Sequence, residues 1–387
     1  RHPPGTRGAT TTVSTRTPTT RRRIGLIAAA AIAVSACGSD DPETQSPDTD
    51  ASAEDADPPA ALTLVTYSSY PPDDADEPNP LQIALDEFTD DTGIEVDVLV
   101  SGDTGTMLAK AELTADNPEG DVMWGIDNTF ISRALDGEIF EPYESPVAAN
   151  VVPAELRALA PEGAATPVDF GDVCVNYDTA ALDAADLPVP TSFDDLADER
   201  YRDLLAVQNP ATSSPGLAFL LATIAEYGSD GWEDYWERLV DNGVRVVDSW
   251  DIAYYEDFSR AGGDRPLVVS YGSSPPFEVL YASEPVDEAP TGVVEATCFR
   301  QVEFAGILRG TEAPDEARQL IDFLVSERYQ REVPLNLFVF PANAEVVLDD
   351  VFIEHATIPD APLSLDPETI AAEREGWVDR WTSIVTG

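Results

Sequence analysis

The fold is decided by three short apolar runs, LTLVTY at Leu62–Tyr67, IEVDVLV at Ile94–Val100 and DVMWGI at Asp121–Ile126. Each run has the length and composition of a β-strand. Between them, Asn79–Thr92 carries apolar residues at helical spacing, and Thr104–Leu113 is predicted to form a second helix. Strands that alternate with helices along the chain favour a mostly parallel sheet with helices on both faces. The sequence therefore predicts an α/β fold.

The loops that follow these strands form the expected ligand-binding edge. In open α/β sheets, ligands gather at the carboxyl ends of the strands, where loops and helix N-termini converge. Here those ends are followed by Tyr67–Tyr70, Ser101–Gly105 and Gly125–Asn128, whose residues are nearly all polar, small or aromatic.

A second group of alternating elements begins after Tyr177. The predicted strands are Leu205–Gln208, Val244–Val247 and Pro266–Ser270, and the predicted helices are Leu217–Tyr227, Trp232–Asn242 and Ile252–Arg260. The chain then returns through a strand at Thr297–Ile307. Two crossings, near Cys174 and near Cys298, are what a two-lobed clamshell requires. We therefore expect lobe 1 at residues 61–175 plus 299–387 and lobe 2 at residues 176–298, each a mostly parallel sheet flanked by helices.

The N-terminal part carries the pattern of an export signal. Arg21–Arg23 precede the apolar run Ile24–Val34, which is too short to span a bilayer in the mature protein, and VSACG follows at Val34–Gly38. A cysteine directly after small residues is typical of a bacterial lipobox. Cleavage before Cys37 would leave that residue to carry the lipid, and residues 1–36 would be an upstream segment and signal peptide. Two alternatives stay open: an ordinary signal followed by an unmodified cysteine, and export by the twin-arginine route.

Residues 37–60 predict an acidic, disordered tether. The stretch is rich in Asp, Glu, Ser and Pro and has no large apolar residue, so it cannot bury enough surface to offset the entropy of ordering it. A lipid anchor followed by a tether would hold a folded domain at the extracytoplasmic face of the cell membrane.

The formal net charge of −51 arises from 73 acidic and 22 basic residues. So few basic residues argue against a nucleic-acid-binding protein, because too few Lys and Arg side chains are present to replace the counterions of the nucleic-acid phosphates. This charge has two compatible interpretations. The acidic side chains form a well-solvated surface, and together they produce an electrostatic field that attracts cations.

The cysteine and histidine content limits the chemistry. Beyond Cys37 the chain has only Cys174 and Cys298, and an even pair in an exported protein predicts a disulfide. A thiol ligand or nucleophile is the alternative, but it lacks a partner residue. The two histidines, His2 and His355, leave no Ser-His or Cys-His pair and no His-based metal site. We expect no catalytic residue, no metal ion and no cofactor.

Several segments, in this order, resemble one family. They are GIDN at 125–128, PVDFG at 167–171, NPATSSPGL at 209–217, SWDIAY at 249–254, SYGSSP at 270–275 and FPAN at 340–343. The chain resembles the thiamine-binding periplasmic proteins of ATP-binding cassette importers, which belong to the type II periplasmic binding proteins. The resemblance covers Leu62 to Ser383. It implies a non-enzymatic monomer that captures thiamine, or a thiamine phosphate, and delivers it to a membrane permease.

The chemistry of thiamine matches the residues that the resemblance selects. An aminopyrimidine joined to a cationic thiazolium suits aromatic faces, with a cation–π contribution of roughly 0.5–2 kcal/mol per face. The residues expected to bind the ligand are the aromatics Tyr67, Trp250, Tyr271, Phe277 and Phe338, the carboxylates Asp103 and Asp127, and the small or hydroxylic residues Thr104, Gly105, Thr212 and Ser213. For the aromatics, packing between lobes is the alternative role; for Thr212 and Ser213, it is capping of the helix that follows.

Two residues depart from the family pattern. Phe338 stands where the relatives place Trp before a Tyr-Pro or Phe-Pro pair, and Phe277 stands where they carry Tyr. These departures leave open the preference among thiamine, its phosphates and its pyrimidine precursors.

Two other functions compete with this interpretation. Relatives in the superfamily bind ferric iron through paired tyrosines, and Tyr254-Tyr255 is such a pair, although adjacent residues on a helix point about 100° apart. Another small cation is possible on the same fold. A lipid-anchored hydrolase would instead use an acidic pair such as Asp169 and Asp172, at a separation that sequence alone does not give.

Overall fold

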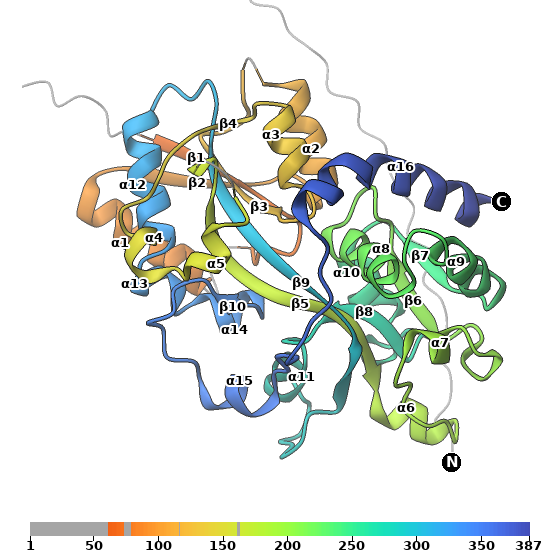
Figure 1. The fold of residues 1–387 in the computed structure, drawn as a ribbon. Helices are drawn as coiled ribbons and strands as arrows, with labels where there is room; N and C mark the ends of the chain where they lie inside the picture. Colours follow the sequence, from red (N-terminus) through yellow and green to blue (C-terminus); the bar gives the residue numbers. More distant parts are fainter. Residues whose placement is uncertain (1–60, 73–78, 116, 161–162) are drawn as a thin grey trace, which may run out of the picture. The chain divides into compact units, whose positions relative to one another are not determined.

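The computed structural model describes residues 61–72, 79–115, 117–160 and 163–387 (Figure 1). The export signal, Cys37 and the whole of the predicted tether at residues 37–60 lie outside the described residues. No helix in the described ranges combines the length and apolar character needed to cross a membrane.

The strands are β1 (Ala61–Thr66), β2 (Glu95–Val100), β3 (Val122–Asp127), β4 (Phe140–Glu141), β5 (Thr166–Asp178), β6 (Leu205–Gln208), β7 (Arg245–Val247), β8 (Leu267–Tyr271), β9 (Thr291–Leu308) and β10 (Phe340–Pro341). The longer helices are α1 (Pro80–Thr92), α2 (Thr104–Leu113), α8 (Ser214–Tyr227), α9 (Trp232–Asp241), α12 (Pro314–Leu324) and α16 (Pro367–Thr386). The shorter helices are α3 (Ile131–Asp136), α4 (Ala148–Val151), α5 (Ala154–Arg157), α6 (Thr179–Ala184), α7 (Phe193–Leu196), α10 (Trp250–Ile252), α11 (Pro275–Leu280), α13 (Glu327–Gln330), α14 (Val333–Leu337) and α15 (Asp350–His355).

One mixed sheet runs through the fold, in the strand order β2-β1-β3-β9-β5-β8-β6-β7, with β10 paired to β5 and β4 to β9. The strands β2, β1 and β3 pair in parallel at one end, and β8, β6 and β7 do so at the other. Between them β9 and β5 form an antiparallel pair that joins the two parallel groups, and Figure 1 shows these two long strands side by side. The predicted α/β class, with mostly parallel groups flanked by helices, is confirmed. The division into lobes at the stated boundaries stays a prediction.

A disulfide links β5 to β9, as the sequence predicted. Cys174 and Cys298 are bonded, with their Cα atoms 4.2 Å apart and a sequence separation of 124. The bond lies where the β5–β9 register shifts, between Val173 and Val175. Both cysteines are buried, so the bond is shielded from solvent.

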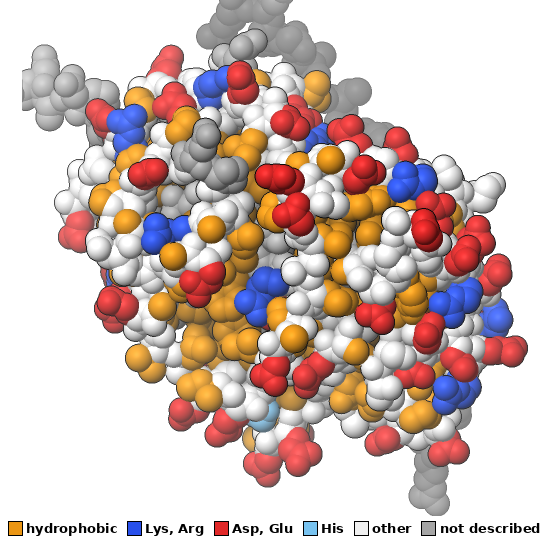
Figure 2. Space-filling model, viewed as in Figure 1, with side chains coloured by type: hydrophobic (Ala, Val, Ile, Leu, Met, Phe, Trp, Pro, Cys, Tyr) orange, Lys and Arg blue, Asp and Glu red, His pale blue; other side chains and the backbone are white. Residues whose placement is uncertain are grey.

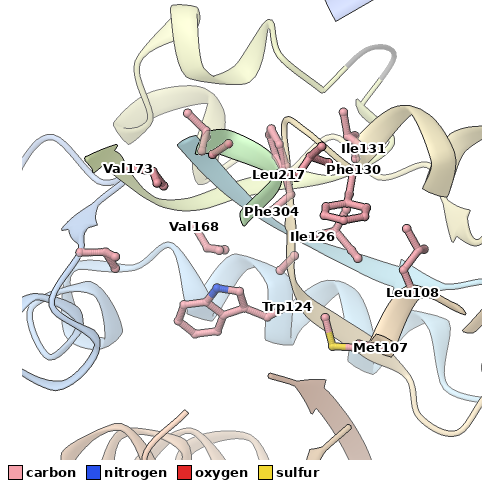
Figure 3. Close-up of a cluster of buried hydrophobic side chains, with 14 of the residues drawn as sticks. Met107, Leu108, Trp124, Ile126, Phe130, Ile131, Val168, Val173, Leu217 and Phe304 are labelled. Carbon is pink, nitrogen blue, oxygen red and sulfur yellow. The ribbon is translucent and has the colours of Figure 1, made fainter. Parts of the chain in front are cut away.

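The core is continuous across the sheet. Figure 3 shows side chains that meet from several elements: Met107 and Leu108 of α2, Trp124 and Ile126 of β3, Phe130 and Ile131 near the start of α3, Val168 and Val173 of β5, Leu217 of α8 and Phe304 of β9. Burying each large apolar side chain contributes about 1.5–3 kcal/mol. Because α8 is buried from Ser214 to Ile224, it fixes the position of its own N-terminus relative to the sheet.

The C-terminal helix α16 packs across the elements of the second half. Trp381 of α16 meets Trp236 of α9 edge to face, with ring centroids 5.4 Å apart, and Arg380 pairs with Glu233 at 2.9 Å. Figure 1 shows α16 beside α9. The same helix places Arg374 over the ring of Phe130. The end of the chain therefore contacts helices from both halves of the fold, α9 and the start of α3.

Two local predictions need correction. The predicted helix Ile252–Arg260 is broken into α10, a π-helical turn at Ala253–Asp257 and a 3₁₀ turn at Ser259–Ala261, because Phe258 adopts an extended conformation. Helix α8 begins earlier than predicted, at Ser214, and no side chain caps it. Pro215 in its first turn has a φ that already suits a helix and lacks the N–H that a cap would satisfy.

Candidate functional site: a pocket at the carboxyl ends of the strands

A cavity of about 350 Å³ opens at the carboxyl ends of β1 and β8, within the size range of small-ligand pockets. Its lining comes from the loop after β1, the start of α2, the start of α8, the α10 region, the end of β8, α11, and the segment from α14 to Val339. These segments are far apart in the sequence, and the fold brings them together at the edge predicted for an α/β sheet.

Seven of the predicted ligand-binding residues line this pocket: Tyr67, Asp103, Thr104, Trp250, Tyr271, Phe277 and Phe338. The other four, Gly105, Asp127, Thr212 and Ser213, lie next to lining residues but are not among those that line it. Ligand contact by any of these residues stays a prediction.

Aromatic rings form a continuous wall on one side of the pocket. Trp250 stacks on Tyr254 at 4.8 Å and 16°, so Tyr254 covers one face of the indole. The indole N–H donates to Ser270 Oγ at 2.9 Å, which fixes the orientation of the ring. Tyr255 meets the indole edge to face, and Phe277 continues the wall. The wall is therefore held in place before any ligand enters.

Phe338 closes this wall from the C-terminal part of the chain. Its ring meets Phe277 edge to face at 5.1 Å. Its backbone has φ 53° and ψ 42°, a left-handed conformation that is uncommon for a bulky residue. Ser273 Oγ donates to the Phe338 carbonyl at 2.6 Å. Backbone strain that a neighbouring element maintains is typical of functional sites. Here the strained backbone of Phe338 directs its aromatic ring into the pocket.

Tyr67 occupies the opposite side, directly after β1. Its ring packs on Gly125, whose φ of +116° and close contact with the ring leave no room for a side chain. Burial raises the pKa of Tyr67, and the nearby charge of Glu303 raises it further. The phenol therefore stays protonated and is available as a hydrogen-bond donor.

Asp103 places a carboxylate at the N-terminus of α2. Its Oδ1 accepts from the Thr104 amide at 2.9 Å, whereas its Oδ2 has no hydrogen-bond partner among the described residues. Burial raises the pKa of Asp103 to about 6, against the effect of the Thr104 hydrogen bond. A cationic ligand at Oδ2 would favour the ionised form.

Two hydrogen bonds join the rims of the pocket. Ser69 Oγ donates to Asp251 Oδ1 at 3.1 Å, and the Gly105 amide donates to the Thr212 carbonyl at 2.9 Å. A Cβ at Gly105 would lie 2.5 Å from the Ala211 carbonyl oxygen, so only glycine allows this approach. Gly105 and Thr212 thus contact each other rather than lining the cavity.

The remaining predicted residues are engaged in local structure. Asp127 Oδ1 accepts from the Thr129 amide and hydroxyl at 2.9 and 2.6 Å and from the Phe130 amide at 3.1 Å, which holds the turn before α3. Ser213 occupies the N-cap position of α8 without a capping side-chain bond.

This chain is similar to known proteins in both sequence and fold. A family model described as bacterial extracellular solute-binding protein matches residues 118–359. The chain belongs to this family. Members of the family are non-enzymatic transport components that work outside the cytoplasm, and this solute-binding protein is therefore extracytoplasmic.

Individual relatives agree with the family. The thiamine-binding periplasmic protein of Escherichia coli (strain K12) is 28% identical over 325 residues, which are 84% of this solute-binding protein and 93% of that relative. A solved structure, periplasmic thiamin binding protein, matches with a TM-score of 0.73 at 26% identity, over 84% of this chain and 96% of that one. Iron uptake protein A2 of Synechocystis is 22% identical over 277 residues, 69% of this chain and 78% of the relative.

The paired tyrosines of this solute-binding protein do not form an open metal site. Tyr254 is buried and donates to Glu278 Oε1 at 2.9 Å, whereas Tyr255 is half exposed and its ring is turned by 87° from that of Tyr254. Burial raises the pKa of Tyr255 to about 12, so without a bound metal its phenol is protonated at neutral pH. Among the described residues, no group of three or more His, Cys, Asp or Glu side chains is placed to hold a metal ion.

The acidic pair considered for a hydrolase is also separated. Asp169 and Asp172 lie three positions apart on β5 in regular register, so their side chains point to opposite faces of the sheet. Arg300 pairs with Asp172 at 2.6 Å, and the Trp124 indole N–H donates to Asp169 at 3.0 Å. Two carboxylates so placed cannot act on one bond.

Sequence reasoning missed several lining residues, among them Asp251, Tyr281 and Glu303. Asp251 lies next to Trp250 in the segment SWDIAY. Its position beside a predicted ligand-binding residue was the signal that could have identified it. Glu303 carries a different signal: it is an acidic residue in the middle of a buried strand, where an unpaired charge is costly.

Proposed function

We propose that this protein captures thiamine outside the cytoplasmic membrane and delivers it to an ATP-binding cassette permease. The observation that carries the proposal is the composition of the pocket. Its described lining combines aromatic rings with Asp103, Asp251 and Glu303 and contains no lysine, arginine or histidine. Such a pocket suits a flat heteroaromatic cation, because rings attract the cation by their faces and carboxylates by their charge.

The two ends of thiamine match two sides of the pocket. The thiazolium is expected against the free face of Trp250, close to Asp103, and the aminopyrimidine between Tyr67 and Tyr271. The absence of a basic group in the described lining supports a preference for thiamine over thiamine diphosphate, because nothing there would neutralise the phosphates. The relatives named for thiamine binding support the same ligand.

Closure of two lobes over the ligand forms part of this proposal. The residues near 176–298 supply Trp250, Tyr271 and Phe277, and the remainder supplies Tyr67, Asp103 and Phe338. The rim contacts Ser69–Asp251 and Gly105–Thr212 are the kind of bonds that would hold a closed state. Exclusion of water would strengthen both the stacking and the charge interaction.

The place of the protein in the cell rests on the sequence. The lipobox at Cys37 and the acidic segment 37–60 support a lipid-anchored monomer that hands its ligand to a permease in the same membrane. Labelling with a radioactive fatty acid should mark the wild-type protein and leave a Cys37→Ala variant unlabelled.

A fluorescence titration tests the ligand. Thiamine, thiamine monophosphate, thiamine diphosphate and ferric citrate are added separately to the purified protein, and tryptophan emission is followed. Thiamine should quench the emission saturably, because it stacks on Trp250, and thiamine diphosphate should bind more weakly. A visible ferric–tyrosinate colour without any thiamine response would replace this proposal by iron binding.

A further inference from the structure

Three acidic residues lie in one row across the middle of the sheet. Glu303 of β9 is paired in register with Asp127 of β3 on one side and with Asp169 of β5 on the other. Residues directly opposite in antiparallel strands project to the same face, so the three carboxyls share one face of the sheet. The exposed fractions of Asp127, Glu303 and Asp169 are 0%, 6% and 0%. Glu303 alone of the three lines the pocket, at its floor.

Each carboxyl in the row keeps one oxygen without a partner. Asp127 Oδ1 is used by the Thr129–Phe130 turn, Asp169 Oδ2 accepts from the Trp124 indole, and Glu303 Oε1 accepts from Gln301 Nε2 at 3.0 Å. With all three carboxyls ionised, Asp127 Oδ2, Asp169 Oδ1 and Glu303 Oε2 have no hydrogen-bond donor among the described residues, and a proton held between Asp169 and Glu303 would pair those two carboxyls with each other. A buried polar atom without a partner is costly, and at a pocket floor it indicates a group that a ligand completes.

Among the residues that the structure describes, no basic side chain compensates the row. The titratable groups that face Glu303 from the packed elements are Tyr67, Asp127, Asp169 and Tyr271. Burial raises the pKa of Glu303, and the charges of Asp169 and Asp127 raise it further. Burial likewise raises the pKa of Asp169. Buried carboxyls this close cannot all ionise, so the row holds a proton near neutral pH.

We propose that Glu303 recognises an N–H edge of the cationic ligand at the pocket floor and releases the proton it shares with Asp169 as that ligand enters. The inference rests on the proposed function, since thiamine supplies both the positive charge and an amine on its pyrimidine. Ionised Glu303 accepts an amine N–H at Oε2, and its proton leaves to the solvent. One positive charge enters as another departs, so the net charge of the buried floor is unchanged.

This exchange explains why Glu303 at the pocket lies between two further buried acids and has no basic partner among the described residues. A permanent arginine would repel the ligand, whereas a proton can leave when the ligand brings its own charge. Selectivity follows as well: a ligand without the amine N–H leaves Glu303 Oε2 unpaired, and a ligand without the positive charge cannot displace the proton.

Calorimetric titration in buffers of different ionisation enthalpy measures the released proton directly. The probes are thiamine and oxythiamine, in which a carbonyl oxygen replaces the amine, and the variants are Glu303→Gln and Glu295→Gln. Glu295 is an exposed glutamate on the same strand, so its variant makes the same charge change away from the pocket. Wild type and Glu295→Gln should release a substantial fraction of a proton per thiamine at pH 6.5 and prefer thiamine over oxythiamine by roughly tenfold or more.

The variant at the floor gives the discriminating result. Glu303→Gln should still bind thiamine through the aromatic wall, but its proton release should fall to the part that Asp103, with a pKa of about 6, supplies, and its preference over oxythiamine should be reduced severalfold. If Glu303→Gln does not fold by circular dichroism, Asp169→Asn takes its place: without the charge of Asp169 the pKa of Glu303 is lower, so proton release at pH 6.5 falls while the preference for thiamine remains. Tight thiamine binding by the wild type without proton release, or an unchanged preference in Glu303→Gln, would overturn the inference. A wild type that does not bind thiamine would overturn the proposed function instead.

Discussion

Trp250 is the residue whose side chain reports ligand stacking most directly. One face of its indole is covered by Tyr254, and its N–H is fixed on Ser270. Trp250→Ala should weaken thiamine binding by about 1–3 kcal/mol, because stacking and cation–π contact are lost. Trp250→Phe retains an aromatic face and should lose less. Isothermal titration measures both, with thermal unfolding to check the fold; equal affinity in wild type and Trp250→Ala would remove this residue from the site.

The carboxyl of Asp103 links pH to both stability and binding. Its folded-state pKa of about 6 lies above the unfolded value of about 3.9, so the folded state holds the proton more tightly. Its contribution to stability is therefore largest below about pH 4 and falls as pH rises through 6. Without ligand, Asp103→Asn should match the wild type near pH 4 and be more stable by about 1–2 kcal/mol at pH 7.5.

The effect of Asp103 on thiamine affinity has the opposite sign. Ionised Asp103 attracts the cation, so the affinity of the wild type should fall as pH drops below about 6, whereas Asp103→Asn should bind more weakly above that pH and change less below it. Denaturant unfolding and titration over pH 4–8 measure the two effects. If the variant were less stable than the wild type at pH 7.5, the carboxyl would be stabilising and its assigned role would fail.

At the scale of elements, the disulfide between β5 and β9 gives a direct test. A thiol reagent applied under denaturing, non-reducing conditions should label neither Cys174 nor Cys298. The bond closes a loop of 124 positions, and its loss in a Cys174→Ala/Cys298→Ala variant should cost up to about 4–5 kcal/mol in the chain-entropy model. Mass spectrometry after alkylation and denaturant unfolding check this, and two labelled thiols in the wild type would contradict it.

Elements with a clear period were predictable, and elements shaped by tertiary contacts were not. Helix α1 follows from its apolar spacing, its Asn79 cap and its leading proline, and α2 was predicted at its observed bounds. The break of the predicted helix at Phe258 could not be predicted from the local sequence pattern. The segment before it is shaped by contacts of Tyr254, which stacks on Trp250 and donates to Glu278, a residue far along the chain.

The candidate site was only partly predictable for the same reason. Residues at strand ends, such as Tyr67 and Trp250, follow from the rule for α/β sheets. The position of Glu303 depends on the register of three strands that are distant in sequence, and that register is a property of the folded sheet.

At the scale of the whole molecule, the rim contact at Gly105 tests closure over the ligand. A methyl group at Gly105 would meet the Ala211 carbonyl and separate the rims. Gly105→Ala should therefore release thiamine about fivefold faster, because the lost hydrogen bond is worth about 1 kcal/mol, and should unfold only a few degrees lower than the wild type. Gly376→Ala, in α16 and away from the pocket, is the matched control. Unchanged release in stopped-flow fluorescence would show that this contact does not hold the ligand.

Equilibrium dialysis of the purified full chain against labelled thiamine tests the central claim most directly, because it needs no optical signal from the protein. We predict saturable binding with about one thiamine per chain, as expected if thiamine binds in the pocket at the carboxyl ends of β1 and β8. Excess thiamine should displace the label, and thiamine diphosphate should displace it poorly. No retained thiamine by a chain that is folded by circular dichroism, or binding that fails to saturate, would contradict the assignment of this pocket to thiamine.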